Sequence, residues 1–134
     1  MFKYIAVAAL PLLAACTSMA PKPDSTPLVL SAPSGWTFVK IDGKAPKSAK
    51  NRLLIEADRI SATVGCNNMG GSAKIEADRL VTGPLMSTKM FCEGLMEQEQ
   101  AVGTLLGASP SYVRTNDRLV LKAGTHSAEL KLLP

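Results

Sequence analysis

Apolar and polar residues alternate along most of the chain after residue 35. In residues 59–64, Ile60, Ala62 and Val64 are separated by polar side chains, and residues 127–132 repeat the pattern. Successive side chains of a strand point to opposite faces, so a period of two indicates a strand buried on one face. Dipeptides typical of turns separate such segments: Asp42-Gly43, Ala57-Asp58, Asn116-Asp117 and Ala123-Gly124. The pattern predicts short strands joined as antiparallel hairpins.

The first alternating segment, residues 36–41, begins at the single tryptophan of the chain. A period of two predicts that Thr37, Val39 and Ile41 share one face of this strand. The residues between them are expected on the opposite face.

One segment, residues 91–106, follows the helical period instead. Phe91, Leu95, Val102 and Leu105 recur at helical spacing, and acidic and amide side chains fill much of the rest. Acids in the first half favour a helix N-terminus through the helix dipole, and Gly107 is placed to end the helix. We predict one amphipathic helix lying across a sheet.

A short sequence occurs twice, as IEADRI from Ile55 and as IEADRL from Ile75. Each copy carries a glutamate and an aspartate two residues apart, a pairing that general acid–base catalysis could use. Each pair lies where a strand should reverse, and aspartate is a favoured turn residue. We interpret both copies as hairpin turns facing solvent.

The N-terminus predicts export. Lys3 precedes an apolar run over residues 5–15, which is too short to cross a bilayer as a helix and is typical of a signal peptide. The sequence LLAAC, ending at Cys16, resembles a bacterial lipobox, in which cleavage occurs before an acylated cysteine. The alternative is an ordinary signal peptide, with Cys16 incidental. Thr17 in place of aspartate favours the outer membrane by resemblance to lipoprotein sorting.

This reading divides the chain into a signal peptide over residues 1–15, a lipidated cysteine and tether over 16–35, and one domain over 36–134. Four prolines in the tether predict an extended spacer. The domain is expected to be a monomer in the periplasm, held to the membrane by its lipid anchor.

A lysine-rich segment is a candidate for binding an anionic partner. Its cations fall within thirteen residues and are Lys40, Lys44, Lys47, Lys50 and Arg52. Such a segment could contact anionic lipid or an acidic envelope protein. The alternative is a solvated loop that keeps the protein soluble. Nucleic acid is not an expected partner, because an exported protein does not meet it.

Catalytic residues are scarce. A cysteine nucleophile needs a base, and His126 is the only histidine of the chain, far in sequence from Cys66. Two cysteines beyond Cys16 and one histidine do not supply the four ligands of a structural zinc site. The sequence therefore predicts no enzyme, no metal and no cofactor.

Two sequence blocks resemble the META domain of HslJ-like heat-shock lipoproteins. They are GCNNMGG from Gly65 and TKMFC from Thr88, and the resemblance extends from Trp36 to about Leu133. It implies an α+β fold: a mostly antiparallel sheet, barrel-like or strongly curved, with one amphipathic helix packed on it. It also implies an envelope-associated role, loosely linked to stress and to tolerance of antibacterial compounds, with no established catalytic residues.

We therefore expect a non-enzymatic envelope lipoprotein that acts through a binding partner. The alternative is an inhibitor-like module that blocks a hydrolase such as lysozyme or a protease, because small secreted β domains often do so. That alternative is an analogy of fold only.

The question left by the first block is the role of Cys66. If Cys16 is acylated, Cys66 and Cys92 are the two remaining thiols in an oxidising compartment, where disulfides persist. We predict that they pair and pin the helix to the sheet. Asn67, Gly70 and Gly71 are expected to form the turn beside this bond, because asparagine and glycine tolerate positive φ.

Overall fold

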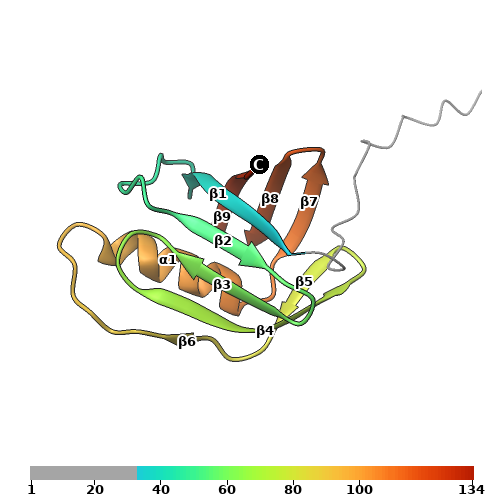
Figure 1. The fold of residues 1–134 in the computed structure, drawn as a ribbon, viewed down its shortest axis with the longest axis horizontal. Helices are drawn as coiled ribbons and strands as arrows, with labels where there is room; N and C mark the ends of the chain where they lie inside the picture. The colour runs from blue at the N-terminus through green and yellow to red at the C-terminus, as the bar shows by residue number, and fades with distance from the viewer. Residues whose placement is uncertain (1–32) are drawn as a thin grey trace, which may run out of the picture.

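A computed structural model describes residues 33–134, and Figure 1 shows their arrangement. Residues 1–32, including Cys16 and most of the expected tether, lie outside the described residues. The elements are β1 (Ser34–Ile41), β2 (Arg52–Ile55), β3 (Arg59–Thr63), β4 (Asn68–Glu76), β5 (Arg79–Thr82), β6 (Met86–Ser87), α1 (Met96–Gly107), β7 (Ser111–Thr115), β8 (Arg118–Ala123) and β9 (His126–Leu132).

The sheet closes on itself. Its strands follow the order β3-β2-β1-β9-β8-β7-β5-β4, and β4 pairs back with β3. All pairings are antiparallel, so the described residues form a closed barrel; β6 pairs only with β4 and lies outside the circuit. The expected fold, a barrel-like antiparallel sheet with one helix, is confirmed.

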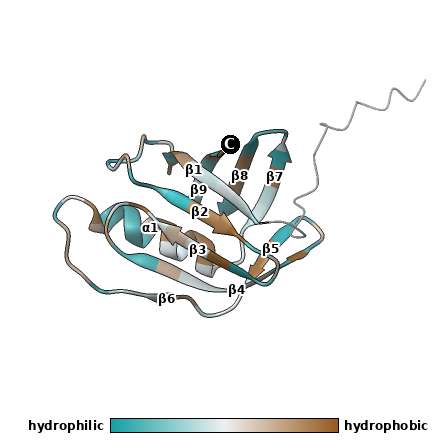
Figure 2. Cartoon of the chain, in the orientation of Figure 1, coloured by the Kyte–Doolittle hydropathy of each residue, from teal (hydrophilic) through white to brown (hydrophobic). Residues whose placement is uncertain are grey.

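The repeated sequence makes two hairpins, as predicted. Ile55 pairs with Ile60 across the first turn, and Ile75 pairs with Leu80 across the second. The two acid pairs therefore lie at strand reversals rather than in a shared cleft. Figure 2 shows that strands of the barrel carry both hydrophilic and hydrophobic residues.

The predicted faces of β1 are wrong in part. Trp36, Phe38 and Ile41 are all buried, whereas Thr37 and Val39 are only half-buried. The cause is an irregularity in the pairing with β9, where the register shifts between Phe38 and Lys40. An extra residue in one strand reverses the alternation beyond it, so Ile41 joins the face of Trp36.

Helix α1 covers one end of the barrel. Val102, Leu105 and Leu106 are buried in the common core. The first turn of α1 bonds to Val64 just beyond β3, and Leu106 accepts a bond from Thr82 at the end of β5. The helix thus spans the rim where β3 and β5 end. Within residues 33–134, no helix is long and apolar enough to cross a membrane.

The helix begins later than predicted. It starts at Met96, and Phe91 is 81% exposed instead of packing on the sheet. Gly94 adopts a φ of 79°, which a right-handed helix does not allow. The chain therefore makes a separate turn before Met96, and Phe91 is left on an irregular segment.

Candidate functional site

The two sequence blocks meet beside the start of α1. Cys66 follows β3, Cys92 precedes α1, and a disulfide joins them with their Cα atoms 6.2 Å apart. This is the pairing predicted from the sequence. It leaves Cys66 without a free thiol, so the cysteine has a structural role here.

Asn67 is the centre of the contact between the blocks. It is buried, and its Oδ1 accepts bonds from the Met90 amide over 2.7 Å and from the Thr88 hydroxyl over 3.0 Å. Its Nδ2 donates to the Met90 carbonyl and to Oε2 of Glu99. Every polar atom of the Asn67 side chain is satisfied, and the segment around Met90 is held from both its amide and its carbonyl.

Glu99 completes this network from the helix. The residue is 6% exposed, and its Oε1 accepts the backbone amide of Asn67 over 2.6 Å while Oε2 accepts the side-chain amide over 2.7 Å. It lies in the first turn of α1, where the helix dipole favours a negative charge. A carboxylate so deep in the protein needs such donors, because burial of an unsatisfied charge is costly.

The neighbouring Gln98 is buried as well and reaches elsewhere. Its Nε2 donates to the carbonyl of Val64, and its Oε1 accepts the backbone amide of Lys47 over 2.9 Å. Adjacent helix residues thus hold two different segments: Gln98 holds the lysine-rich segment, and Glu99 with Asn67 holds residues 88–90.

A groove runs between α1 and residues 85–91, with a volume of about 790 Å³. Met96, Gln100, Gly103 and Thr104 line it on the helix side, and among residues 33–134 Glu99 is the only acid that borders it. The rest of the lining has apolar residues, Met69, Leu85, Met90 and Phe91, and polar ones, Asn67, Ser87, Thr88 and Lys89.

The groove has an exposed apolar rim. Phe91 is 81% exposed and Met90 is 58% exposed, and Met86 at the adjoining β6 is 82% exposed. Single exposed apolar residues are ordinary, but several gathered along one groove mark an interaction surface. Methionine side chains are flexible and polarisable, which suits them to contact ligands of varied shape.

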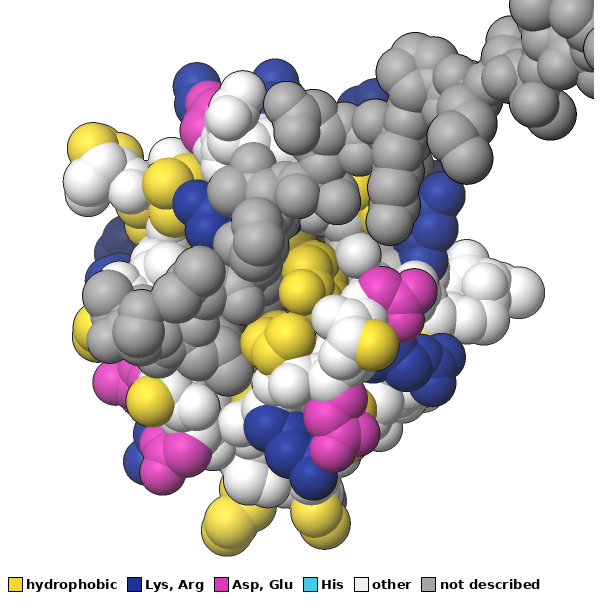
Figure 3. Space-filling view, turned by 90° about the vertical axis from the view of Figure 1, so that its right-hand side faces the viewer, with side chains coloured by type: hydrophobic (Ala, Val, Ile, Leu, Met, Phe, Trp, Pro, Cys, Tyr) yellow, Lys and Arg dark blue, Asp and Glu magenta, His cyan; other side chains and the backbone are white. Residues whose placement is uncertain are grey.

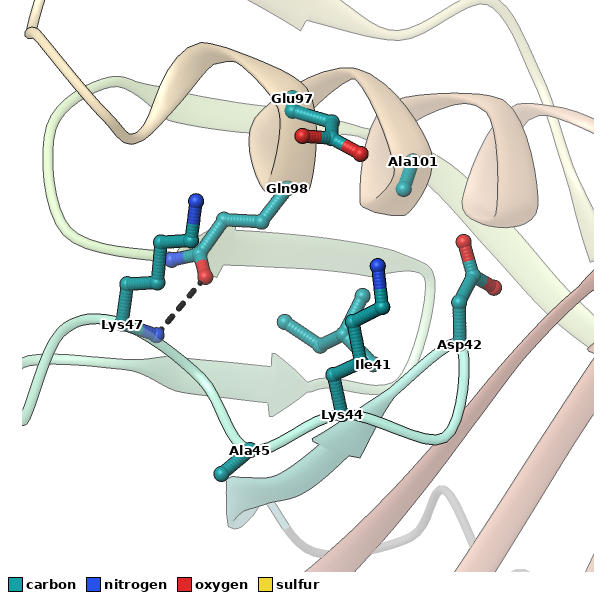
Figure 4. Close-up of a pocket in the computed structure, with 8 residues that line it drawn as sticks. All are labelled: Ile41, Asp42, Lys44, Ala45, Lys47, Glu97, Gln98 and Ala101. Carbon is teal, nitrogen blue, oxygen red and sulfur yellow. Dashed lines mark hydrogen bonds between the residues drawn. The ribbon is translucent and has the colours of Figure 1, made fainter.

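The lysine-rich segment lies on the other side of the helix. Lys44 and Lys47 border a small pocket of about 110 Å³ together with Glu97, Gln98 and Ala101 of α1, as Figure 4 shows. Lys40 instead pairs with Glu129 across the sheet, at 3.9 Å. Lys50 is exposed in the loop, and Arg52 begins β2 beside Gly35. The structure therefore spreads these cations over strand, loop and pocket.

Another face of the barrel shows no field of one sign. Figure 3 views the side that carries β5 and β7, where basic and acidic side chains are interspersed with hydrophobic ones. This mixture is typical of a solvated protein surface.

His126 pairs with Asp42 and not with a cysteine. Its Nδ1 lies 2.8 Å from Oδ2 of Asp42, and the backbone amide of Ser127 donates to Oδ1. Partial burial raises the pKa of Asp42, but the bonds from Ser127 and His126 and the charges of His126 and Lys44 lower it more. The net pKa of Asp42 lies below its ordinary value of 3.8. The pair clips the turn after β1 to the start of β9.

The glycines of the first block differ in role from the prediction. Gly70 and Gly71 lie within β4 and not in a turn. A Cβ on Gly70 would lie 2.8 Å from the carbonyl oxygen of Ile60, and one on Gly71 would lie 2.7 Å from that of Pro84. These positions require glycine for close backbone approach, whereas Gly65, with a φ of 118°, makes the turn.

Sequence reasoning missed Asn67, Gln98 and Glu99 as buried polar residues. A signal for two of them existed, because positions 98 and 99 fall on the same helical stripe as Leu95, Val102 and Leu106. Polar residues on an apolar stripe indicate buried hydrogen bonds. Within residues 33–134, no three His, Cys, Asp or Glu side chains are grouped to hold a metal ion.

Comparison with known proteins identifies the family. The sequence model of the META domain matches residues 29–133. A solved NMR structure is 23% identical, covers 74% of this chain and 88% of its own, and superposes with a TM-score of 0.66. A second NMR structure, of a protein from Burkholderia xenovorans, is 19% identical, covers 85% of this chain and 99% of its own, and has a TM-score of 0.62. These likenesses show the fold alone, and no curated protein matches the chain.

Proposed function

The chain belongs to the META domain family, and from this premise we propose that it is a non-catalytic binding protein of the bacterial envelope. In this proposal Cys16 carries the lipid anchor at the outer membrane, and the barrel faces the periplasm. The protein supports tolerance of envelope stress or of antibacterial compounds by binding a partner through the groove beside α1.

The observation that carries this proposal is the exposed apolar rim on a segment held in place. Phe91 and Met90 lie in water, yet the flanking backbone is fixed by Asn67 and by the Cys66–Cys92 disulfide. An exposed aromatic side chain on a fixed segment gives up little conformational freedom on binding. A rim built only for stability would bury these side chains.

Complementation of a deletion strain under envelope stress tests the proposal. We expect the parent chain to restore growth and a Phe91→Ser, Met90→Ser double variant to fail at equal protein level. Val113→Ser is the matched control, because Val113 is 52% exposed but lies on β7, outside the groove lining. Full complementation by the double variant would overturn the proposal.

The anchor has its own test. Metabolic labelling with palmitate should mark the parent chain and not Cys16→Ser, and label retained on the variant would contradict acylation of Cys16.

The lysine-rich segment is tested in a chain without the anchor, by its binding to anionic vesicles. A contact of this segment with lipid is supported if the binding falls with added salt and also in the triple variant Lys44→Gln, Lys47→Gln, Lys50→Gln.

A second candidate, an inhibitor of a hydrolase, is favoured by one feature. Phe91 is exposed on a segment pinned by a disulfide, a form that suits insertion into an active-site cleft. Inhibition of lysozyme or of a serine protease at equimolar protein, lost in Phe91→Ser, would favour this function over the first.

A further inference from the structure

The groove beside α1 has the size of a small-molecule site. Its volume of about 790 Å³ falls within the roughly 300–1,000 Å³ of typical ligand pockets. Its lining combines apolar side chains from Met69, Leu85, Met90, Phe91 and Met96 with polar ones that include Lys89, Glu99 and Gln100. Ligand pockets likewise join apolar surface to polar groups that fix the orientation of the ligand.

The buried charge in this lining is negative. Of the acids that the structure describes, Glu99 alone borders the groove, and it is 6% exposed. Its carboxylate bonds to Asn67 through neutral N–H groups, and the ion pairs found within residues 33–134 do not include Glu99. Lys89 also borders the groove, but Lys89 is exposed and forms none of those ion pairs.

Amide dipoles and a helix N-terminus stabilise a buried carboxylate only with partial charges. A full positive charge from a ligand would interact with it in a medium of low dielectric, where charge pairs are strong. The aromatic ring of Phe91 on the same groove can also attract a cation through its face.

We propose that this groove binds a small amphipathic cation, whose apolar body lies against the methionines and Phe91 and whose amine faces Glu99. This inference rests on the proposed role of the groove as the binding surface and adds the chemical class of the ligand. An anion of the same shape would meet the Glu99 carboxylate and bind less well, and a neutral molecule would gain only the apolar contacts.

Three probes that share one apolar body and differ in charge separate these cases: 4-phenylbutylamine, 4-phenylbutanol and 4-phenylbutanoate. They are titrated against the full-length chain carrying Cys16→Ser, with the methionine methyl groups labelled for NMR. We expect shifts at Met69, Met90 and Met96, and a Kd for the amine about tenfold below that of the alcohol. The carboxylate should bind most weakly.

Two substitutions locate the effect. Glu99→Gln should raise the Kd of the amine to that of the alcohol and leave the alcohol unchanged within about twofold. Glu97→Gln is the matched control: it makes the same change two residues earlier, at a position that lines the other pocket. It should leave binding of all three probes unchanged.

Glu99→Gln also changes the bonds to Asn67 and thereby the segment that Asn67 holds. A second variant is therefore chosen that alters the groove and leaves these bonds intact. A Cβ on Gly103 would meet only Met69 Sδ, at 3.8 Å, an ordinary contact. Gly103→Leu should therefore fold, fill the groove and weaken the amine and the alcohol alike, by about tenfold or more.

The outcomes are distinct. If the amine and the alcohol bind equally and Gly103→Leu weakens both, the proposed preference for a cation is wrong. The groove would then bind apolar molecules whatever their charge. Absence of any shift at the groove methionines would overturn the inference entirely. Neither result bears on the rim as a surface for a partner, which the Phe91→Ser, Met90→Ser complementation decides separately.

Discussion

Two irregular segments flank the first turn of α1, and they differ in what they expose. Residues 42–51 expose lysines, which cost little in water, whereas residues 84–95 expose Phe91, Met86 and Met90. Gln98 anchors the first segment through one neutral bond to Lys47, and Glu99 anchors the second through Asn67. The apolar rim thus lies over a buried network that includes a carboxylate, whereas the lysine-rich segment is held by a neutral side chain.

The largest expected effect comes from Asn67→Ala. It removes the side-chain donor to Oε2 of Glu99 and leaves the Met90 amide without its acceptor, whereas the backbone amide at position 67 can still donate to Oε1. Buried groups left unsatisfied, one of them charged, should lower the free energy of unfolding by about 3–5 kcal/mol. Urea unfolding measures this, and Asn68→Ala, at the exposed next residue, should cost less than about 1 kcal/mol. Equal losses in the two variants would refute the special role of Asn67.

Loss of the disulfide should have a slightly smaller effect. Replacing Cys66 and Cys92 with serine removes a link across 26 residues, which lowers stability by about 3–4 kcal/mol on the chain-entropy model. Thermal unfolding with and without reductant gives the size. A parent chain whose melting temperature is insensitive to reductant would count against the bond.

Gln98→Ala probes the other segment. Two neutral partners, the Lys47 amide and the Val64 carbonyl, lose their bonds. We expect a loss of about 1–2 kcal/mol, smaller than for Asn67→Ala because no charge is stranded. A cost as large as that of Asn67→Ala would remove the contrast between the two segments.

The smallest effect concerns pH. Because the pKa of Asp42 is lower in the folded chain than its ordinary value of 3.8, its contribution to stability is present above that pH. The contribution is lost as the pH falls through the folded pKa. Asp42→Asn should remove this dependence, a difference of less than about 1 kcal/mol for so exposed a group. Melting temperatures are measured for the parent and for Asp42→Asn from pH 7 to pH 2. If they change with pH in parallel, the Asp42–His126 pair does not stabilise the fold.

The sequence predicted the strands better than the site, for physical reasons. Alternation in β3 and β9 follows from one face packing on the core, and both were correct. In β1 the register irregularity reversed the faces, which a period of two cannot reveal. The pairing of Cys66 with Cys92 followed from the count of thiols.

The rim could not be predicted, because Phe91 fits the helical period of the residues after it. The positive φ of Gly94, a property of the folded backbone, interrupts the helical path between Phe91 and Met96. Asn67 gave no signal at all, since an asparagine two residues after a glycine is typical of an exposed turn. Its burial depends on residues 21 to 32 positions away in the chain.

Native-state hydrogen exchange at Met90 tests most directly whether the rim is held for binding. The Met90 amide donates to buried Asn67, whereas the Lys50 amide donates to the Ser48 hydroxyl in an exposed turn. We predict that Met90 opens with a free energy within about 1 kcal/mol of the β4 amides, while Lys50 exchanges almost freely. Exchange at Met90 as fast as at Lys50 would show that the rim is not held, and would contradict the account.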